Sequence, residues 1–288
     1  MKNLLLLCFW ISSTAAFAQT GSEIFLFDVK EKKGKLILTN PQNVTNHVGY
    51  DNQPSFHSDQ PILFYSSFNE EGRADIKQYN YKTNITKNIT TTNEREYSPT
   101  LTPDKKYVSC IIQRDNGVQD LGKYPLDGGD PIVLIDNLTV GYHVWADNSH
   151  VALFVLGKES APNTLHYLQL PTKKDTILAE NIGRSLHKVP KESAITYVHK
   201  ISDTNWVIKK LNTNTLQSET LATAFPGRED IAWTSSGLIL SSDGSKLYHL
   251  RGTEWKEIVL KESIPALKGI TRLAVSPRGD KMAVVVSE

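Results

Sequence analysis

One short pattern recurs six times along this chain and limits what it can fold into. Each copy consists of a marking residue, which is apolar in five of the six copies, followed by a polar turn and then an apolar strand. The clearest copy is Glu96–Cys110, EYSPTLTPDKKYVSC, in which Pro103 and Asp104 suit successive positions of a tight turn. The residue before each turn marks the six copies, Phe56, Leu101, Trp145, Lys188, Trp233 and Val275, which lie 45, 44, 43, 45 and 42 residues apart. Such regular spacing predicts a repeat architecture.

Each interval between copies also holds two further strands. After the strand Ile62–Ser67, for example, the segments Ile76–Tyr81 and Ile85–Thr90 follow, each separated by a short polar turn. Hydrophobic residues alternate with period two, and no stretch shows a convincing helical period. Four strands in about 44 residues are typical of a propeller blade. We therefore predict an all-β fold, a six-bladed β-propeller of four-stranded antiparallel blades.

The two ends of the chain predict how the ring closes. The last copy is followed by one strand only, Met282–Ser287, so its blade lacks two strands. Two strands without a preceding copy, Ile24–Asp28 and Lys35–Thr39, lie near the amino terminus. We expect these N-terminal strands to complete the C-terminal blade, because an open array or two separate sheets would leave both end units incomplete. No change in composition divides the chain, so residues 19–288 are predicted to form a single domain.

The first 18 residues differ from the rest and predict export. A positive start at Lys2 precedes the apolar run Leu4–Ile11, and Ala16-Phe17-Ala18 forms a small-residue exit. This order is typical of a secretory signal peptide, and the run is too short to span a membrane. We expect cleavage after Ala18 and a periplasmic or secreted protein without a membrane anchor. Cys110 would then be the remaining cysteine, and we expect it to be a buried, inert thiol.

The charge balance argues against two classes of partner. The chain has 32 Lys and Arg residues against 31 Asp and Glu residues, a formal net charge of +1. Nucleic-acid and anionic-membrane binding both favour a clear excess of basic residues. We therefore expect no nucleic acid partner.

Three copies of the pattern carry a family resemblance. The segments SPTLTPDKKYVSC, QPSFHSDQPILFYSS and LAVSPRGDKMAVVVS resemble the PD40 (WD40-like) repeats of TolB-type six-bladed propellers, and the copies at Leu101 and Val275 match best. The resemblance covers the predicted mature chain and implies a periplasmic binding scaffold. TolB proteins carry a small α/β domain ahead of the propeller. Here the first predicted strand follows Ala18 within a few residues, so we expect a propeller without that domain and carry over no role in the Tol system.

The search for chemistry yields no catalytic residues. The chain has no Gly-x-Ser-x-Gly motif, and His57-Ser58-Asp59 are consecutive turn residues that cannot form a triad. His143 and His187 occupy similar positions in neighbouring copies, and TolB-like oligogalacturonate lyases are similar in building a histidine metal site at the channel. Two aligned histidines are too few for such a site, so we expect no metal and no cofactor.

The best candidate for a ligand site is the channel mouth. In a propeller the innermost strand of each blade lines the axis, so the residues just before the one that marks each copy should meet at one end of the channel. They form a ring of mixed charge with aromatic members, and the alternative is a solvated rim without a ligand. The ring contains Asn52, Gln53, Glu96, Tyr97, Tyr142, His143, Arg184, Ser185, Glu229, Asp230, Thr271 and Arg272.

These observations favour a non-enzymatic, monomeric binding scaffold that takes a protein, peptide or glycan ligand at the mouth. One alternative is a polysaccharide-processing enzyme that resembles the oligogalacturonate lyases, with His143 and His187 near its site. Bound metal and unsaturated products from uronate polymers would distinguish that enzyme from a scaffold. Another alternative is a structural or envelope-assembly module, which would show no small-ligand stabilisation in a thermal-shift screen.

Overall fold

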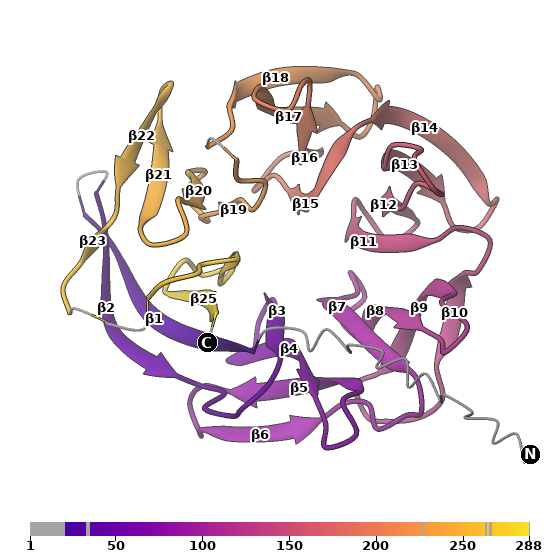
Figure 1. The fold of residues 1–288 in the computed structure, drawn as a ribbon, viewed down its shortest axis with the longest axis horizontal. Coiled ribbons are helices and arrows are strands. Elements are labelled where there is room, and N and C mark those ends of the chain that lie inside the picture. Colours follow the sequence, from indigo (N-terminus) through magenta and orange to yellow (C-terminus); the bar gives the residue numbers. More distant parts are fainter. Residues whose placement is uncertain (1–20, 33–34, 226, 263, 265–266, 288) are drawn as a thin grey trace, which may run out of the picture.

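The computed structural model describes residues 21–32, 35–225, 227–262, 264 and 267–287, and shows six β-sheets arranged in a ring (Figure 1). The predicted signal peptide, residues 1–18, lies outside the described residues. Within the described ranges the secondary structure consists of strands, without α-helices, so none of these residues form a helix that could cross a membrane. The predicted all-β, six-bladed propeller is confirmed.

Five blades each contain four consecutive antiparallel strands, ordered from the channel outward. The first two blades are β3 (Asp51–Phe56), β4 (Ile62–Phe68), β5 (Ala74–Asn80) and β6 (Ile85–Asn88), then β7 (Arg95–Leu101), β8 (Tyr107–Gln113), β9 (Gln119–Pro125) and β10 (Ile132–Ile135). The third and fourth are β11 (Val140–Trp145), β12 (His150–Val155), β13 (Thr164–Gln169) and β14 (Lys174–Glu180), then β15 (Ile182–Lys188), β16 (Ala194–Lys200), β17 (Trp206–Asn212) and β18 (Ser218–Thr223). The fifth is β19 (Ala232–Trp233), β20 (Ile239–Ser242), β21 (Leu247–Arg251) and β22 (Glu254–Glu257).

The sixth blade joins both ends of the described chain, as predicted. Its strands from the channel outward are β24 (Arg272–Val275), β25 (Lys281–Ser287), β1 (Ser22–Lys32) and β2 (Lys35–Asn43). Strand β1 pairs antiparallel with β25 over seven residues, from Ser22 opposite Ser287 to Asp28 opposite Lys281. A fifth short strand that we did not predict, β23 (Val259–Leu260), pairs in parallel with β2 (Figure 1). It covers part of an outer edge that would otherwise present unpaired backbone groups.

The second strand of most blades forms the core of the ring. Strands β4, β8, β12 and β25 are buried along nearly their whole length, because neighbouring blades cover both faces of each sheet. Ile111 of β8 and Leu153 of β12, for example, belong to one apolar cluster that spans two blades. Cys110 is fully buried, as predicted, and burial raises the pKa of its thiol. Stability therefore comes from packing between blades.

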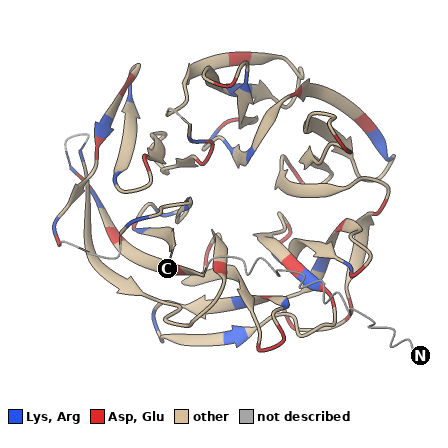
Figure 2. Cartoon of the chain, viewed as in Figure 1, with Lys and Arg blue, Asp and Glu red and all other residues tan. Residues whose placement is uncertain are grey.

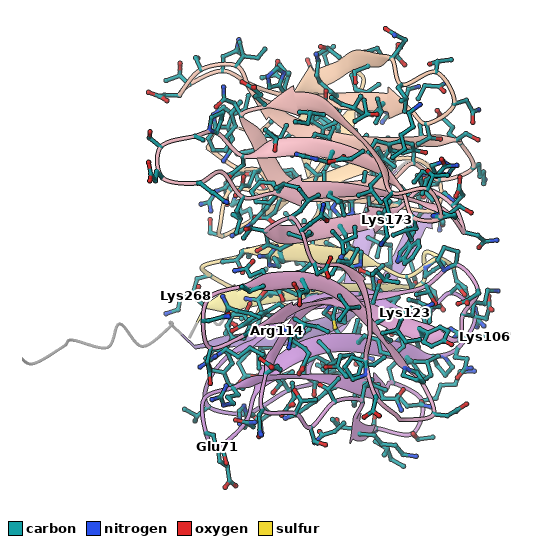
Figure 3. All side chains as sticks on the ribbon, turned by 90° about the vertical axis from the view of Figure 1, so that its right-hand side faces the viewer. Glu71, Lys106, Arg114, Lys123, Lys173 and Lys268 are labelled. Carbon is teal, nitrogen blue, oxygen red and sulfur yellow. The ribbon has the colours of Figure 1, made fainter. Side chains whose placement is uncertain are left out.

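The two faces of the disc have different loops. Glu71 and Lys268 lie on one side of the disc and Lys106 on the other (Figure 3). We call the side with Glu71 and Lys268, on the left in Figure 3, the upper face. The inner strands begin on this face, and the β4–β5 and β8–β9 turns lie there. The other side is the lower face, where the inner strands end in the repeated turns. Lys, Arg, Asp and Glu are interspersed around the ring (Figure 2), in keeping with the net charge of +1.

Candidate ligand site in the central channel

The inner strands are irregular where they begin, at the upper mouth of the channel. Four of them change register there, between Asn52 and Ser55, Tyr97 and Thr100, Val140 and Tyr142, and Ile182 and Leu186. Gln53 and Ser98 adopt φ values of 57° and 56°, in the left-handed region that residues other than glycine rarely occupy. Bulges of this kind redirect side chains relative to simple alternation. Side chains at the mouth therefore point in directions that a regular strand would not give them.

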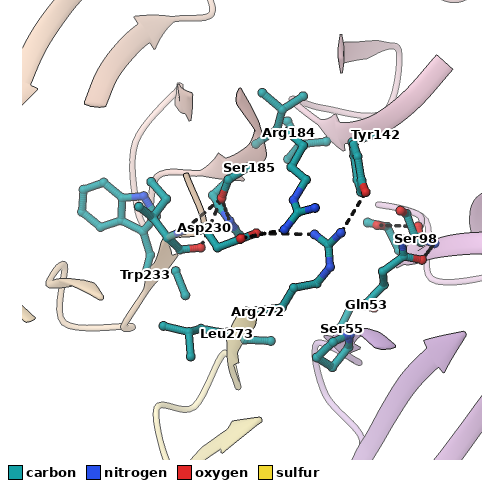
Figure 4. A pocket seen from close by; sticks show the side chains of 18 of the residues that line it. Gln53, Ser55, Ser98, Tyr142, Arg184, Ser185, Asp230, Trp233, Arg272 and Leu273 are labelled. Atoms are coloured by element: carbon teal, nitrogen blue, oxygen red, sulfur yellow. Dashed lines mark hydrogen bonds and ion pairs between the residues drawn. The ribbon is translucent and has the colours of Figure 1, made fainter. Parts of the chain in front are cut away.

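Arg272, at the start of β24, reaches across the mouth to three other blades. Its Nε donates a hydrogen bond to Oδ1 of Asn52 at 3.0 Å, and its Nη2 donates to the Tyr142 hydroxyl at 2.8 Å. Its Nη1 lies 3.5 Å from Oδ1 of Asp230 (Figure 4), and its guanidinium carbon is 5.1 Å from the centre of the Tyr142 ring. We call Asn52, Tyr142, Arg184, Asp230 and Arg272 the cross-channel network.

Arg184, on β15, shares the Asp230 carboxylate with Arg272 (Figure 4). Its Nη2 donates to Oδ2 of Asp230 at 2.9 Å, and its Nε lies 3.4 Å from Oε1 of Glu229. Glu229 also pairs with Lys200 at 2.8 Å. Burial disfavours the charged form of Arg184, but Asp230, Tyr142 and Glu229 together outweigh that effect, and the pKa of Arg184 is raised. The mouth therefore holds a permanently charged guanidinium at a partly buried position.

The cross-channel network separates two cavities. The upper one, which we call the vestibule, has a volume of about 530 Å³, and the lower cavity has a volume of about 320 Å³. The network residues Tyr142, Arg184 and Arg272, together with Gln53, line both cavities. Asp230 lines the lower cavity, and Asn52 lines the vestibule. These side chains therefore form a polar floor between the vestibule and the channel below.

The structure brings most of the predicted mouth residues together, at different depths. Those that line the vestibule are Asn52, Gln53, Tyr97, Tyr142, Arg184, Thr271 and Arg272. His143, Ser185 and Asp230 line the lower cavity. Glu229 and Glu96 are not among the described residues that line either cavity. Glu229 stands behind Arg184 as an ion-pair partner of its side chain.

Glu96 lies inside its own blade, away from both cavities. It is fully buried, and its carboxylate accepts hydrogen bonds from the hydroxyls of Thr90, Thr92 and Tyr124 at 3.0, 2.5 and 2.9 Å. Burial raises the pKa of Glu96, while these hydrogen bonds favour the ionised form. These contacts hold the start of β7 against β9 and the β6–β7 connection. Glu96 therefore positions the strand at the mouth and does not line the mouth itself.

His143 and His187 both line the lower cavity, and each ring contacts a serine. Nε2 of His143 lies 2.7 Å from the Ser109 hydroxyl, and Nε2 of His187 lies 2.9 Å from the Ser185 hydroxyl. Burial lowers the pKa of each imidazole to about 4, so both rings are neutral near pH 7. Among the described residues no group of three or more His, Cys, Asp or Glu side chains is arranged to hold a metal ion. The histidine pair does not fit a metal centre.

The vestibule also includes residues that the sequence did not single out. Tyr50 precedes β3 and meets Tyr97 edge to face, with 6.3 Å between ring centres. Gln113 and Gln119 flank the β8–β9 turn and line the same cavity. Our prediction considered only residues of the innermost strands, just before the residue that marks each copy. The antiparallel order of a blade places the turn between its second and third strands on the same face, and that rule could have identified the two glutamines.

Comparisons with known proteins place the fold. No protein-family model matches the chain, and no curated protein matches it in sequence. A structure described as a putative TolB from Agrobacterium tumefaciens is 14% identical with a TM-score of 0.71, over 94% of this chain and 99% of that one. An oligogalacturonate lyase in complex with manganese is 14% identical with a TM-score of 0.59, over 94% and 99%. A chain of a nidogen–laminin complex is 9% identical with a TM-score of 0.64, over 92% and 98%.

At these identities the likeness concerns the fold alone. The six-bladed ring, its closure through β1 and the extent of the match to the putative TolB all agree with the repeat pattern in the sequence. The chain therefore has the fold of a TolB-type six-bladed β-propeller.

Proposed function

We propose that the protein is an exported, non-catalytic binding propeller that receives a protein, peptide or glycan ligand in the vestibule. One observation carries the proposal: the vestibule, about 530 Å³ in volume, is lined by aromatic and hydrogen-bonding side chains from five of the six blades. Concave sites with a few convergent polar groups are the usual form of a ligand site. A neighbour of the same fold comes from a nidogen–laminin complex, so protein recognition by such a ring has a precedent.

The cross-channel network supports this role, because it keeps the floor of the vestibule rigid. Arg272 is held by contacts to three blades before any ligand arrives, so little side-chain freedom remains to be lost on binding. Tyr97 and Tyr142 add flat apolar surface with a polar tip, which suits both peptide and sugar ligands.

The experiment that tests the proposal is affinity capture from the native envelope or culture fluid. Wild-type protein is compared with Tyr97→Ala and Gln119→Trp, which alter the vestibule wall, and with Lys87→Trp on the outer strand β6, which serves as the control. We expect the vestibule variants to lose a partner that the wild type and the control retain. A partner that survives both vestibule changes and is lost with Lys87→Trp would place binding on the outer surface.

Export is the second part of the proposal, and it is supported by the sequence of the first 18 residues. Lys2, the apolar run Leu4–Ile11 and the Ala16-Phe17-Ala18 exit occur in the order of a cleavable signal. Intact-mass measurement of protein from the native host should give a chain that begins at Gln19. A cytoplasmic, uncleaved chain would contradict this part and leave the vestibule proposal standing.

A polysaccharide-processing activity is the alternative with a specific observation behind it. The fold is similar to that of an oligogalacturonate lyase, and His143 and His187 line one cavity. Both rings are already engaged with serine hydroxyls and lack further metal ligands among the described residues, which favours the binding role. Purified protein that contains stoichiometric metal and releases unsaturated products from uronate polymers would reverse this preference.

A further inference from the structure

We propose that the vestibule recognises a carboxylate group on its ligand, and that Arg272 and Arg184 bind it. This inference rests on the proposed function, since it names the chemistry of a ligand in that same cavity. It is carried by the distribution of charge around the channel mouth.

The charged side chains that line the vestibule, within the described part of the chain, are Arg184 and Arg272. Its other lining residues are aromatic, amide, hydroxyl, apolar or glycine, so the vestibule contains no carboxylate of its own among these residues. Asp230 lines the lower cavity, whereas both arginines line the two cavities. The Asp230 carboxylate therefore approaches the guanidinium groups from below, and the side open to a ligand is positive.

The charges at the network do not balance. Among the described residues, Arg184, Arg272 and Lys200 interact there with two carboxylates, those of Asp230 and Glu229. The surplus of one positive charge is shared by these three cations, of which Arg272 is the least exposed, at 15%. A partly buried group of cations that its carboxylates do not fully neutralise is unfavourable, and an anion that enters the site relieves that cost.

The guanidinium groups also have hydrogen-bond donors to spare. A guanidinium has five N–H donors, and Arg272 uses three of them, one on each nitrogen. The contact to Asp230 is a long one at 3.5 Å. The Arg184 guanidinium donates one hydrogen bond to the described residues, from Nη2 to Asp230, so donors on its two terminal nitrogens are left over. Planar guanidinium groups match the two oxygens of a carboxylate better than other cations do.

The walls of the vestibule indicate what carries the carboxylate. Tyr50, Tyr97 and Tyr142 offer aromatic faces and edges, and Gln113 and Gln119 offer amide groups. Such a wall suits a compact body with hydroxyl or amide groups, as in a uronic acid residue or the last residues of a peptide chain. Both sources share the carboxylate, which is the group that the arginines select.

Two matched pairs of probes test the inference. One pair is a tripeptide with a free terminal carboxylate and its C-terminal amide; the other is a uronic acid disaccharide and its methyl ester. Titration calorimetry at low salt should show at least one acid binding tenfold or more tightly than its neutral partner, and the pair that responds identifies the source. Arg272→Gln and Arg184→Gln should each weaken that acid by tenfold or more.

Controls separate recognition from folding. Arg251→Gln changes an exposed arginine on β21, away from the vestibule, and should leave acid binding unchanged. Arg272→Lys keeps the charge and loses the planar fork, so we expect intermediate binding from a folded protein of near-native melting temperature. Neutral probes that bind as well as the acids, acids that fail to bind at all, or arginine variants that bind acids normally would each overturn the inference. A partner that is lost with Gln119→Trp but captured normally by Arg272→Gln and Arg184→Gln would overturn it while leaving the proposed function intact.

Discussion

At the scale of single residues, His143 shows how burial determines protonation. The ring is 6% exposed, its Nε2 lies 2.7 Å from the Ser109 hydroxyl, and its Nδ1 has no hydrogen-bond partner among the described residues. Burial lowers the pKa of His143 to about 4, from an ordinary value of 6.5. The folded protein therefore binds fewer protons at this site than the unfolded chain, and acid favours unfolding.

We predict that the contribution of His143 to stability falls as the pH drops below 6.5 and continues to fall until about pH 4. Linkage gives a loss of about 2.5 kcal/mol at pH 4.5 relative to pH 7. Denaturant unfolding of the wild type and of His143→Gln at both pH values measures it, because the glutamine does not titrate. The wild type should lose more stability than the variant. Equal losses would show that the ring accepts a proton in the folded state.

Glu96 shows why the site was only partly predictable from the sequence. The prediction placed Glu96 and Tyr97 together in the mouth because both precede Leu101, but neighbouring residues of a strand point to opposite faces, and the structure places the tyrosine in the vestibule wall and the glutamate inside the blade. The register shift between Tyr97 and Thr100 separates both residues from the repeated turn, so counting back from Leu101 does not tell which of the two faces the channel. A bulge is set by tertiary packing around the channel and leaves no local signature in composition or period. The segments of the chain that form the mouth were therefore predictable from the sequence, and the orientation of their individual side chains was not.

At the scale of structural elements, four of the six repeated turns contain a residue in the left-handed backbone region: Lys105, Lys191, Gly237 and Gly279. In the turn that follows β7, Asp104 accepts hydrogen bonds from the Thr102 hydroxyl and the Lys106 amide, and Lys105 adopts a φ of 60°. At the equivalent place in the last blade, Gly279 adopts a φ of 71°. A left-handed residue is unstrained as glycine and costs about 1 kcal/mol as any residue with a β-carbon.

We predict that Lys105→Gly is more stable than Lys105→Ala by about 1 kcal/mol. Both variants remove the Lys105–Asp59 ion pair, which is exposed on both sides, so their difference isolates the backbone conformation. Thermal or urea unfolding provides the measurement. Gly237→Ala is the matched converse: its φ is 93°, a β-carbon there would meet no atom within 4 Å, and it should destabilise by a similar amount. If alanine equalled glycine at both positions, the turn would not require a left-handed residue.

At the scale of the whole molecule, the sequence predicted the fold because its signals are periodic. The six turns, the strand count in each interval and the half-built blades at the two ends all indicated the same ring, and the long-range pairing at the closure followed from the strand count. The parallel strand β23 escaped prediction because it consists of two residues, Val259 and Leu260, at the outer edge of the ring. Elements that short carry no usable pattern.

Closure through β1 predicts that distant blades unfold together. We call the pairing of β1 with β25 the seam of the ring. Ile24 of β1 is fully buried and clusters with Val285 across the seam and with Leu63 and Tyr65 of the first blade. Ile24→Ala should cost about 2–5 kcal/mol by loss of buried methyl groups. In a closed ring every blade has two neighbours, and loosening one seam removes support from both directions. In an open array the damage would stay local.

The described tryptophans make this difference measurable, because none of them lies in the closing blade; they are Trp145, Trp206, Trp233 and Trp255. Their fluorescence reports the third, fourth and fifth blades, whereas far-ultraviolet circular dichroism reports all strands. We expect Ile24→Ala to lower the urea midpoint by the same amount with both probes, as Ile208→Ala in β17 should also do. A fluorescence midpoint that stays at the wild-type value, while circular dichroism shows an early loss of signal, would mean that the closing blade unfolds independently. The pairing of β1 with β25 would then close the ring without coupling the unfolding of the other blades to that of the closing blade.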